Sequence, residues 1–120
     1  MSNSMSNTLP GSSQGKLLRI HISEGDTHQG KPLHEAIVAK CREMGISGAT
    51  VFPGLEGYGE SAEMHKAHLV RKDRPLVIMI VDTAERLAAL APVVEAMMDT
   101  GLTAVSNVRM TRVLKKIAEA

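Results

Sequence analysis

The sequence predicts a single α+β domain built from short strands and two helices. The chain has 120 residues, which is about the size of one domain. Apolar residues alternate with polar ones in some segments, which is the period of a strand, and recur every three to four residues in others, which is the period of a helix. Because only 2% of the residues are aromatic, we expect an aliphatic, methionine-rich core.

The first predicted strand runs from Lys16 to Ser23. Its apolar side chains fall on one face, namely Leu18, Ile20 and Ile22. Arg19 and His21 share the opposite face, where we expect interface polar residues.

A loop, Glu24 to Lys31, separates this strand from the first predicted helix. Pro32 suits the first turn of a helix, and Gly45 suits its end because glycine adopts the left-handed conformation readily. One side of the helix carries its apolar residues: Leu33, Ala36, Ile37, Cys41 and Met44.

Three strands are predicted in the middle of the chain. Ser47 to Phe52 and Ala67 to Arg71 are expected to form a hairpin whose enlarged tip is the segment 53–66. The next strand, Leu76 to Val81, has no polar position, so we expect it to be covered on both faces.

The second helix follows directly. Asp82 with Glu85 resembles a capping arrangement, Pro92 predicts a kink or restart, and Gly101 is expected to close the helix. Its buried side would hold Leu87, Leu90, Ala91, Val94, Met97 and Met98. The last strand lies within Leu102 to Val113.

This β-α-β-β-α-β order is that of the ferredoxin-like fold, an antiparallel sheet with two helices on one face. The other face would then expose aliphatic surface, which predicts an oligomer. We divide the chain into a disordered tail at 1–15, one domain at 16–113 and a C-terminal tail at 114–120.

Charge and composition exclude several classes of function. With 14 basic and 13 acidic residues the net charge is +1, so no broad field favours nucleic acid or an anionic membrane. The longest apolar run, Leu76 to Val81, is far too short to cross a bilayer, and the N-terminus does not resemble a signal peptide. A single cysteine, Cys41, fits a reducing cytoplasm and is expected to be a buried, inert thiol.

One loop has a composition suited to ligand binding, namely Gly54-Leu-Glu-Gly-Tyr-Gly59. Glycines let a backbone approach a phosphate or carboxylate closely. The same composition also suits a flexible hairpin tip, and the lysine and hydroxyl residue of a P-loop are missing.

Four segments in this order resemble the small PII-like proteins formerly catalogued as a domain of unknown function: Lys16-Leu-Leu-Arg-Ile-His-Ile; Gly48-Ala-Thr-Val-Phe with the glycine loop; Leu76-Val-Ile-Met-Ile-Val-Asp; and Gly101 followed by Asn107-Val-Arg-Met. The resemblance covers about Lys16 to Val113. It implies a ferredoxin-like subunit, a homotrimer with sheets facing inward, a ligand cleft between subunits, and regulation rather than catalysis.

The same resemblance implies an adenine nucleotide as the effector and a transporter, channel or enzyme as the regulated partner, contacted through the 53–66 loop. The residues that it assigns to the ligand are Glu56, Gly57, Tyr58, Gly59, Arg109 and Arg112. The loop is shorter than in true PII proteins, and no second glycine-rich phosphate loop precedes the last strand. These differences leave three ligands as alternatives: ATP, a different adenine nucleotide, or another anion. In a straight strand Arg109 and Arg112 would point to opposite faces, which prevents them from serving one subunit's pocket together.

Two other functions remain as alternatives. An acyl-phosphate hydrolase of the same fold would need an arginine in the loop after the first strand, where Glu24 to Lys31 offers Gln29 and Lys31 instead. A metal-binding trimer would depend on His65 and His68; because zinc sites need three or four defined ligands, we expect no metal. His28 and His34 are expected to face solvent.

Overall fold

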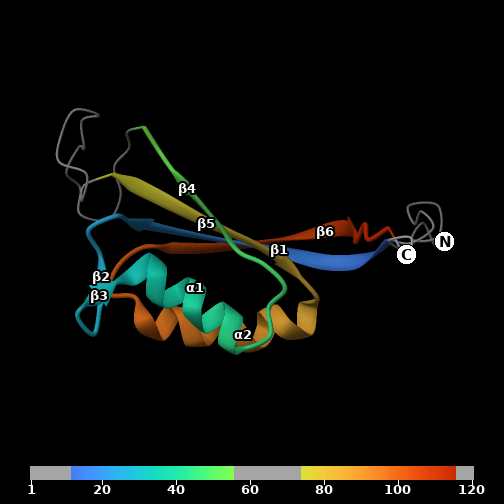
Figure 1. Ribbon diagram of the computed structural model, residues 1–120, viewed down its shortest axis with the longest axis horizontal. Coiled ribbons are helices and arrows are strands. Elements are labelled where there is room, and N and C mark those ends of the chain that lie inside the picture. Colours follow the sequence, from blue (N-terminus) through green and yellow to red (C-terminus); the bar gives the residue numbers. More distant parts are fainter. Residues whose placement is uncertain (1–11, 56–73, 116–120) are drawn as a thin grey trace, which may run out of the picture.

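The computed structural model describes residues 12–55 and 74–115. Within these residues the chain forms, in order, β1 (Ser12–Ser23), β2 (Thr27–His28), β3 (Lys31–Pro32), α1 (Leu33–Glu43), β4 (Thr50–Pro53), β5 (Pro75–Asp82), α2 (Ala84–Met97) and β6 (Leu102–Thr111). Figure 1 shows this arrangement.

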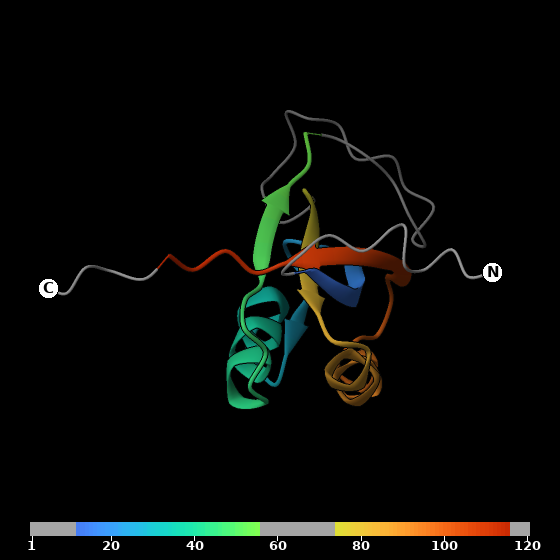
Figure 2. The same cartoon turned by 90° about the vertical axis from the view of Figure 1, so that its right-hand side faces the viewer.

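The domain has two layers, a sheet and a pair of helices. Four strands pair in the order β4-β5-β1-β6, and every pairing is antiparallel. Both helices lie on the same side of the sheet, as the end-on view in Figure 2 makes plain. This confirms the predicted α+β, ferredoxin-like fold. A small ribbon of β2 and β3, which the sequence did not predict, joins β1 to α1.

The core lies between the sheet and the helices and is aliphatic, as expected. Its fully buried members come from four elements: Leu18, Ile20, Leu33, Ile37, Ile78, Ile80, Leu90 and Val94. Because antiparallel partners point their side chains to the same side, the pairing of Leu18 with Ile80 and of Ile20 with Ile78 places these four on the helix side. Met97 and Met98 pack against the core and are partly buried.

β1 begins at Ser12, so the expected start at Lys16 is four residues too late. Ser12 pairs with Thr111 and Gly15 with Val108. Residues 12–15, expected in the N-terminal tail, therefore belong to the sheet. Backbone pairing with β6 needs no apolar alternation, which is why the pattern did not reveal it.

β4 pairs directly with β5, with Val51 opposite Ile78. The sequence pattern instead predicted a hairpin between β4 and a strand at Ala67 to Arg71, which lies outside the described residues.

Within the described residues β5 is covered on one face, by the helices, and the cover expected on its other face is that of a neighbouring subunit. Its buried residues alternate, at Leu76, Ile78, Ile80 and Asp82, and these face the helices. The three side chains between them, Val77, Met79 and Val81, lie on the other side and are partly or largely exposed. The continuous apolar run therefore contributes to two surfaces, of which the described residues of this chain cover one.

α2 departs from the expectations at its start, its middle and its end, where the helix stops at Met97 instead of being closed by Gly101. The cap is Thr83, whose hydroxyl accepts a hydrogen bond from the Arg86 amide at 3.2 Å, rather than Asp82. The helix continues through Pro92 without a break, so the expected restart does not occur. Neither described helix is long and apolar enough to span a membrane.

Candidate functional site

The candidate site residues fall at the two opposite ends of the sheet. One end, which we call the loop end, holds the end of β4 at Pro53, the start of β5 at Pro75 and the start of β6 at Leu102. The other, which we call the arginine end, holds the end of β5 at Asp82 and the end of β6 at Thr111. Figure 1 shows β1 and β6 running between the two ends.

At the loop end the chain leaves β4 through Gly54. The Gly54 amide donates to the carbonyl oxygen of Pro75 at 2.7 Å, which fixes where the segment between β4 and β5 begins. A Cβ at residue 54 would stand 2.9 Å from Cγ of Pro75, so this position favours glycine. The predicted ligand residues Glu56, Gly57, Tyr58 and Gly59, and the histidines His65 and His68, lie outside the described residues.

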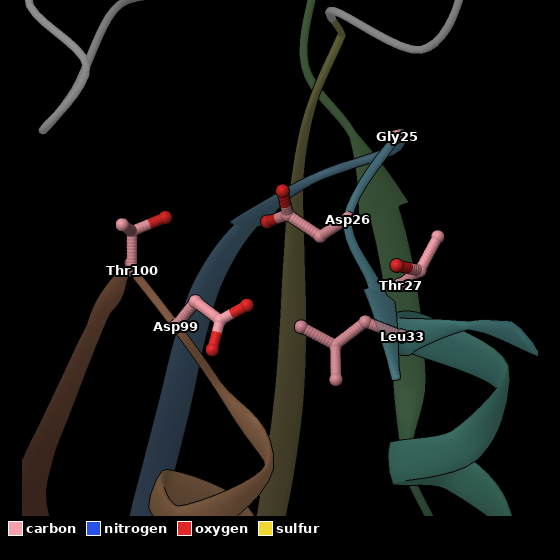
Figure 3. A pocket seen from close by; sticks show the side chains of 6 residues that line it. All are labelled: Gly25, Asp26, Thr27, Leu33, Asp99 and Thr100. Atoms are coloured by element: carbon pink, nitrogen blue, oxygen red, sulfur yellow. The ribbon is translucent and has the colours of Figure 1, made fainter. Parts of the chain in front are cut away.

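An open pocket lies at the same end, between the loop after β1 and the loop after α2 (Figure 3). Its lining is Gly25, Asp26, Thr27, Leu33, Asp99 and Thr100. Asp26 already accepts a hydrogen bond from the Ser23 amide at 2.9 Å, so its carboxylate stabilises the local turn. With two carboxylates and no basic side chain in its lining, this pocket alone is unsuited to a phosphate.

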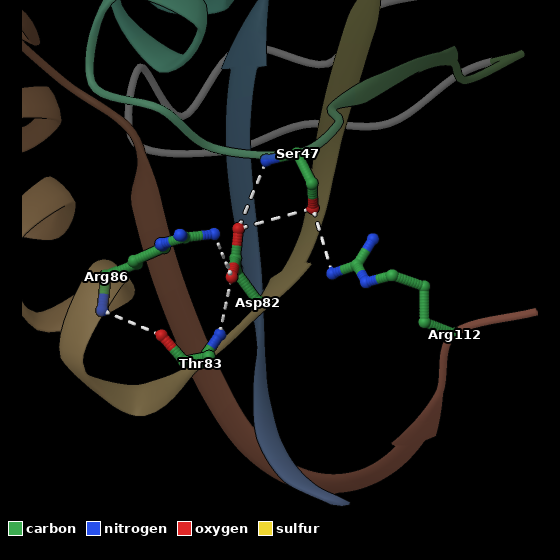
Figure 4. Close-up of polar contacts among 5 residues, drawn as sticks. All are labelled: Ser47, Asp82, Thr83, Arg86 and Arg112. Atoms are coloured by element: carbon green, nitrogen blue, oxygen red, sulfur yellow. Dashed lines mark hydrogen bonds and ion pairs between the residues drawn. The ribbon is translucent and has the colours of Figure 1, made fainter. Parts of the chain in front are cut away.

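At the arginine end a buried carboxylate joins three segments. The Asp82 side chain is 0% exposed. Its Oδ1 accepts from the Thr83 amide at 2.8 Å and lies 3.5 Å from Nη1 of Arg86. Its Oδ2 accepts from the Ser47 amide at 3.1 Å and from the Ser47 hydroxyl at 3.4 Å. Figure 4 shows Asp82 at the centre of these contacts, which tie the α1–β4 connection to the start of α2.

These contacts keep Asp82 ionised. Burial by itself raises the pKa of the carboxyl, but the amides of Thr83 and Ser47 and the charge of Arg86 outweigh it and hold the pKa of Asp82 below its ordinary value. The site therefore contains a fixed, paired negative charge behind the exposed surface.

Arg112 joins this cluster from the end of the chain. Its Nη2 donates to the Ser47 hydroxyl at 3.3 Å, and the rest of the side chain is exposed (Figure 4). Since β6 ends at Thr111, Arg112 lies beyond the strand, and strand alternation does not set its direction.

Arg109 lies within β6, directly opposite Gln14 of β1, and is exposed. Arg109 is seven steps along the extended strand from Leu102, which is about 23 Å. The structure therefore brings Arg109 and Arg112 to the same end of the sheet but does not bring them to the loop end of their own chain.

The face of the sheet opposite the helices is largely apolar; we call it the helix-free face. Between the end of β5 and the loop end, the pairing register places on it Leu17, Arg19, His21, Thr50, Phe52, Val77, Met79, Val81, Leu102, Ala104 and Ser106. Phe52 is 48% exposed, Val81 40% and Leu102 59%. Arg19 and His21 do share this face, as predicted. Exposed apolar side chains on several strands of one sheet face are typical of an interface between proteins.

The remaining candidates carry no site in the described residues. These residues contain no group of three or more His, Cys, Asp or Glu side chains that could hold a metal ion. Cys41 is buried, and burial raises the pKa of its thiol, which lowers the fraction present as the reactive thiolate. His28 and His34 are partly buried rather than fully solvent-facing, and Nδ1 of His34 is buried without a hydrogen-bond partner.

Sequence reasoning missed Ser47 and the roles of Asp82 and Arg86. Ser47 and Asp82 are 35 residues apart, and no spacing in the chain predicts their contact. The only available signal was an aspartate at the end of an otherwise apolar strand, because a buried carboxylate requires hydrogen-bond partners.

Comparison with known proteins gives one family match and several structural matches. The model of the family DUF190, described as Uncharacterized ACR, COG1993, matches residues 15–110. A UPF0166 protein of Aquifex aeolicus is 39% identical over 74 residues, which are 60% of this chain and 70% of the relative.

Two solved structures share the fold. CPII from Thiomonas intermedia K12, bound to ADP and bicarbonate, has a TM-score of 0.62 and 23% identity, covering 84% of this chain and 92% of CPII. A putative PII-like signaling protein from Thermus thermophilus has a TM-score of 0.64 and 14% identity, covering 83% of this chain and 92% of the other. These matches agree with the resemblance found in the sequence.

Proposed function

The chain belongs to the DUF190 family and has the fold of PII-like proteins, and from this premise we propose that it is a regulatory protein that binds an adenine nucleotide between subunits. The proposal extends to a homotrimer, to a cytoplasmic setting and to control of a transporter, channel or enzyme through the 53–66 segment. Its role is regulation rather than catalysis.

The observation that carries the proposal is the separation of the two candidate regions. Arg109 and Arg112 lie at the arginine end, whereas Gly54, from which the glycine segment continues, lies at the loop end. The ten residues of β6 span about 33 Å between the two ends. A nucleotide shorter than this span would reach both regions only where the loop end of one copy meets the arginine end of another.

The helix-free face supplies the surface for such an assembly. Its exposed side chains, Phe52, Val81 and Leu102, belong to strands β4, β5 and β6, so the surface extends across the sheet. Burying apolar surface contributes about 25 cal/mol per Å². Packing three such faces together removes the exposed apolar area and sets neighbouring chains side by side.

Adenine nucleotide is the ligand class best supported by the comparison. CPII, which shares the fold, was solved with ADP and bicarbonate. Two arginines at one end of the sheet fit the negative charge of a diphosphate, since guanidinium groups bind phosphate oxygens through paired N–H donors. The acidic pocket at the loop end, with Asp26 and Asp99, does not suit phosphate and leaves the phosphates to Arg109 and Arg112.

The test combines ligand binding with mass in solution. We expect AMP, ADP or ATP to raise the melting temperature and to give saturable heats in titration calorimetry, because a ligand that binds only the folded state stabilises it. Sedimentation equilibrium is expected to give three times the mass of one chain. No response to any adenine nucleotide, or a stable monomer at binding concentrations, would contradict the proposal.

The matched variants are Arg112→Ala and Arg42→Ala. Both remove one positive charge from an exposed arginine, but Arg42 lies in the last turn of α1 and has no place in the proposed site. We expect Arg112→Ala to weaken ADP binding about tenfold or more, as for loss of a charge-assisted contact. Arg42→Ala is expected to bind like the unchanged protein.

A further inference from the structure

The Ser47 hydroxyl lies between a buried anion and an exposed cation. On one side its Oγ is 3.4 Å from Oδ2 of Asp82, and on the other it is 3.3 Å from Nη2 of Arg112. The three side chains come from the α1–β4 connection, the end of β5 and the residue after β6 (Figure 4). Three distant parts of the chain thus meet through one oxygen atom.

The charge of Asp82 fixes the direction of both hydrogen bonds. An ionised carboxylate only accepts hydrogen bonds, and a guanidinium only donates them. Ser47 has a single hydroxyl proton, which it donates to Asp82, and its oxygen lone pairs then accept from Arg112. A neutral side chain in place of Asp82 would remove this preference, and the hydroxyl would be free to turn.

Within the described residues Arg112 is held by a hydroxyl and has no carboxylate in direct contact with it. The ion-pair partner of Asp82 is Arg86, at 3.5 Å, whereas Arg112 touches the hydroxyl. A guanidinium has five N–H donors, and the contact with Ser47 uses one terminal nitrogen. Its other nitrogens make no hydrogen bond with any residue in 12–55 or 74–115, so this exposed side chain can still contact an anion.

We propose that Ser47 and Asp82 are positioning residues that hold the Arg112 guanidinium at the arginine end for an anionic group of the ligand. This inference rests on the proposed function, because that function assigns phosphate binding to Arg112. It adds two residues that do not touch the ligand. Their effect is to restrict the Arg112 side chain before the ligand binds. Binding then costs less side-chain conformational entropy.

Calorimetric titration with ADP tests the proposal in a double-mutant cycle of Ser47→Ala and Arg112→Ala. Ser47→Ala removes the hydroxyl and keeps the backbone amide that donates to Asp82, so we expect the variant to fold. We expect it to weaken ADP binding about three- to tenfold, the usual worth of one hydrogen bond. In the Arg112→Ala background the same change is expected to have no effect.

Ser47→Thr is the matched control, since it keeps a hydroxyl. We expect its affinity for ADP to lie within about twofold of that of the unchanged protein, a smaller change than the loss of one hydrogen bond causes. A merely structural role for Ser47 would weaken binding equally in both arginine backgrounds, and that result would overturn the proposal. So would unchanged binding in Ser47→Ala alongside a clear loss in Arg112→Ala.

A second measurement separates this proposal from the proposed function. If the unchanged protein binds no adenine nucleotide, the proposed function fails, and the side-chain NMR signal of Arg112 still reports on its contact with Ser47. We expect Ser47→Ala to shift and narrow that signal, because the guanidinium becomes mobile, and Ser47→Thr to leave it in place. An unshifted Arg112 signal in Ser47→Ala would overturn the positioning role.

Discussion

Gly101 lies directly against the backbone of His21. A Cβ at residue 101 would stand 2.6 Å from the His21 carbonyl oxygen, closer than real Cβ atoms approach. Its φ of +128° is also one that residues with side chains rarely adopt. This contact packs the turn after α2 against β1 and sets where β6 begins.

We expect Gly101→Ala to destabilise the fold by about 2 kcal/mol or more, since strained backbone alone costs about 1–3 kcal/mol. The free energy of unfolding in urea measures this directly. Gly48→Ala is the control, because nothing lies within 4 Å of a Cβ at residue 48. Equal stability of the Gly101 and Gly48 variants would show that the turn relaxes without cost.

Thr83 caps α2, with its hydroxyl accepting from the Arg86 amide at 3.2 Å. We expect Thr83→Ala to lower the free energy of unfolding by about 1 kcal/mol, the usual worth of a helix cap. Thr83→Ser keeps the hydroxyl and is expected to stay near the original value. A serine variant as unstable as the alanine variant would argue that the methyl group, rather than the cap, matters.

The low pKa of Asp82 predicts a specific loss of stability in acid. The folded-state pKa of Asp82 lies below the unfolded value of about 3.9. The contribution of the ionised Asp82 to the free energy of unfolding is therefore fully present above that value. It is lost as pH falls through the folded-state pKa. The charged groups around this carboxylate in the described residues are Arg86, in contact with it, Arg112, one hydroxyl away, and Lys16, its partner across the β1–β5 pairing.

Urea unfolding from pH 7 to pH 2 measures this loss. We expect the decline below about pH 4 to be smaller in Asp82→Asn, which has no charge there to lose. Asp99→Asn, on an exposed aspartate, serves as the control and is expected to keep the original decline. An unchanged acid profile in Asp82→Asn would contradict the assignment.

Val81 lies on the helix-free face and is 40% exposed in the single chain. We expect Val81→Glu to break the proposed trimer into monomers, because burying an unpaired carboxylate at an interface is costly. Sedimentation velocity measures the change, and circular dichroism checks that the fold remains. Ala89→Glu, on an exposed position of α2, is expected to leave the mass unaltered. A trimer that stays intact in the Val81→Glu variant would place the interface elsewhere.

The sequence predicted best the elements whose side chains face the core. Leu18, Ile20 and Ile22 alternate along β1, and the stripe of Leu33, Ile37 and Cys41 in α1 is buried as expected. In both cases the apolar residues repeat with the period of the element and lie on the one face that it buries. The local sequence pattern and the tertiary packing therefore favour the same structure.

The errors arose where backbone pairing or distant contacts decide the structure. Ser12 to Gly15 have no strand pattern, yet they pair with β6, and Met110 fills the space beside Gly15, 2.7 Å from where a Cβ would stand. Arg112 and Ser47 are 65 residues apart, and only the folded sheet brings them together. The predicted ligand residues at 56–59 remain predictions.

The length of β6 has a genetic consequence under the proposed assembly. Each proposed nucleotide site between subunits takes its loop end and its arginine end from different chains. A chain with a mutation at one end therefore still contributes its intact other end to the site that it shares with a neighbour. Co-expression of an arginine-end mutant with a loop-end mutant would then regenerate roughly a quarter of these sites by random mixing around a closed ring. Two inactive alleles would complement each other in the same cell.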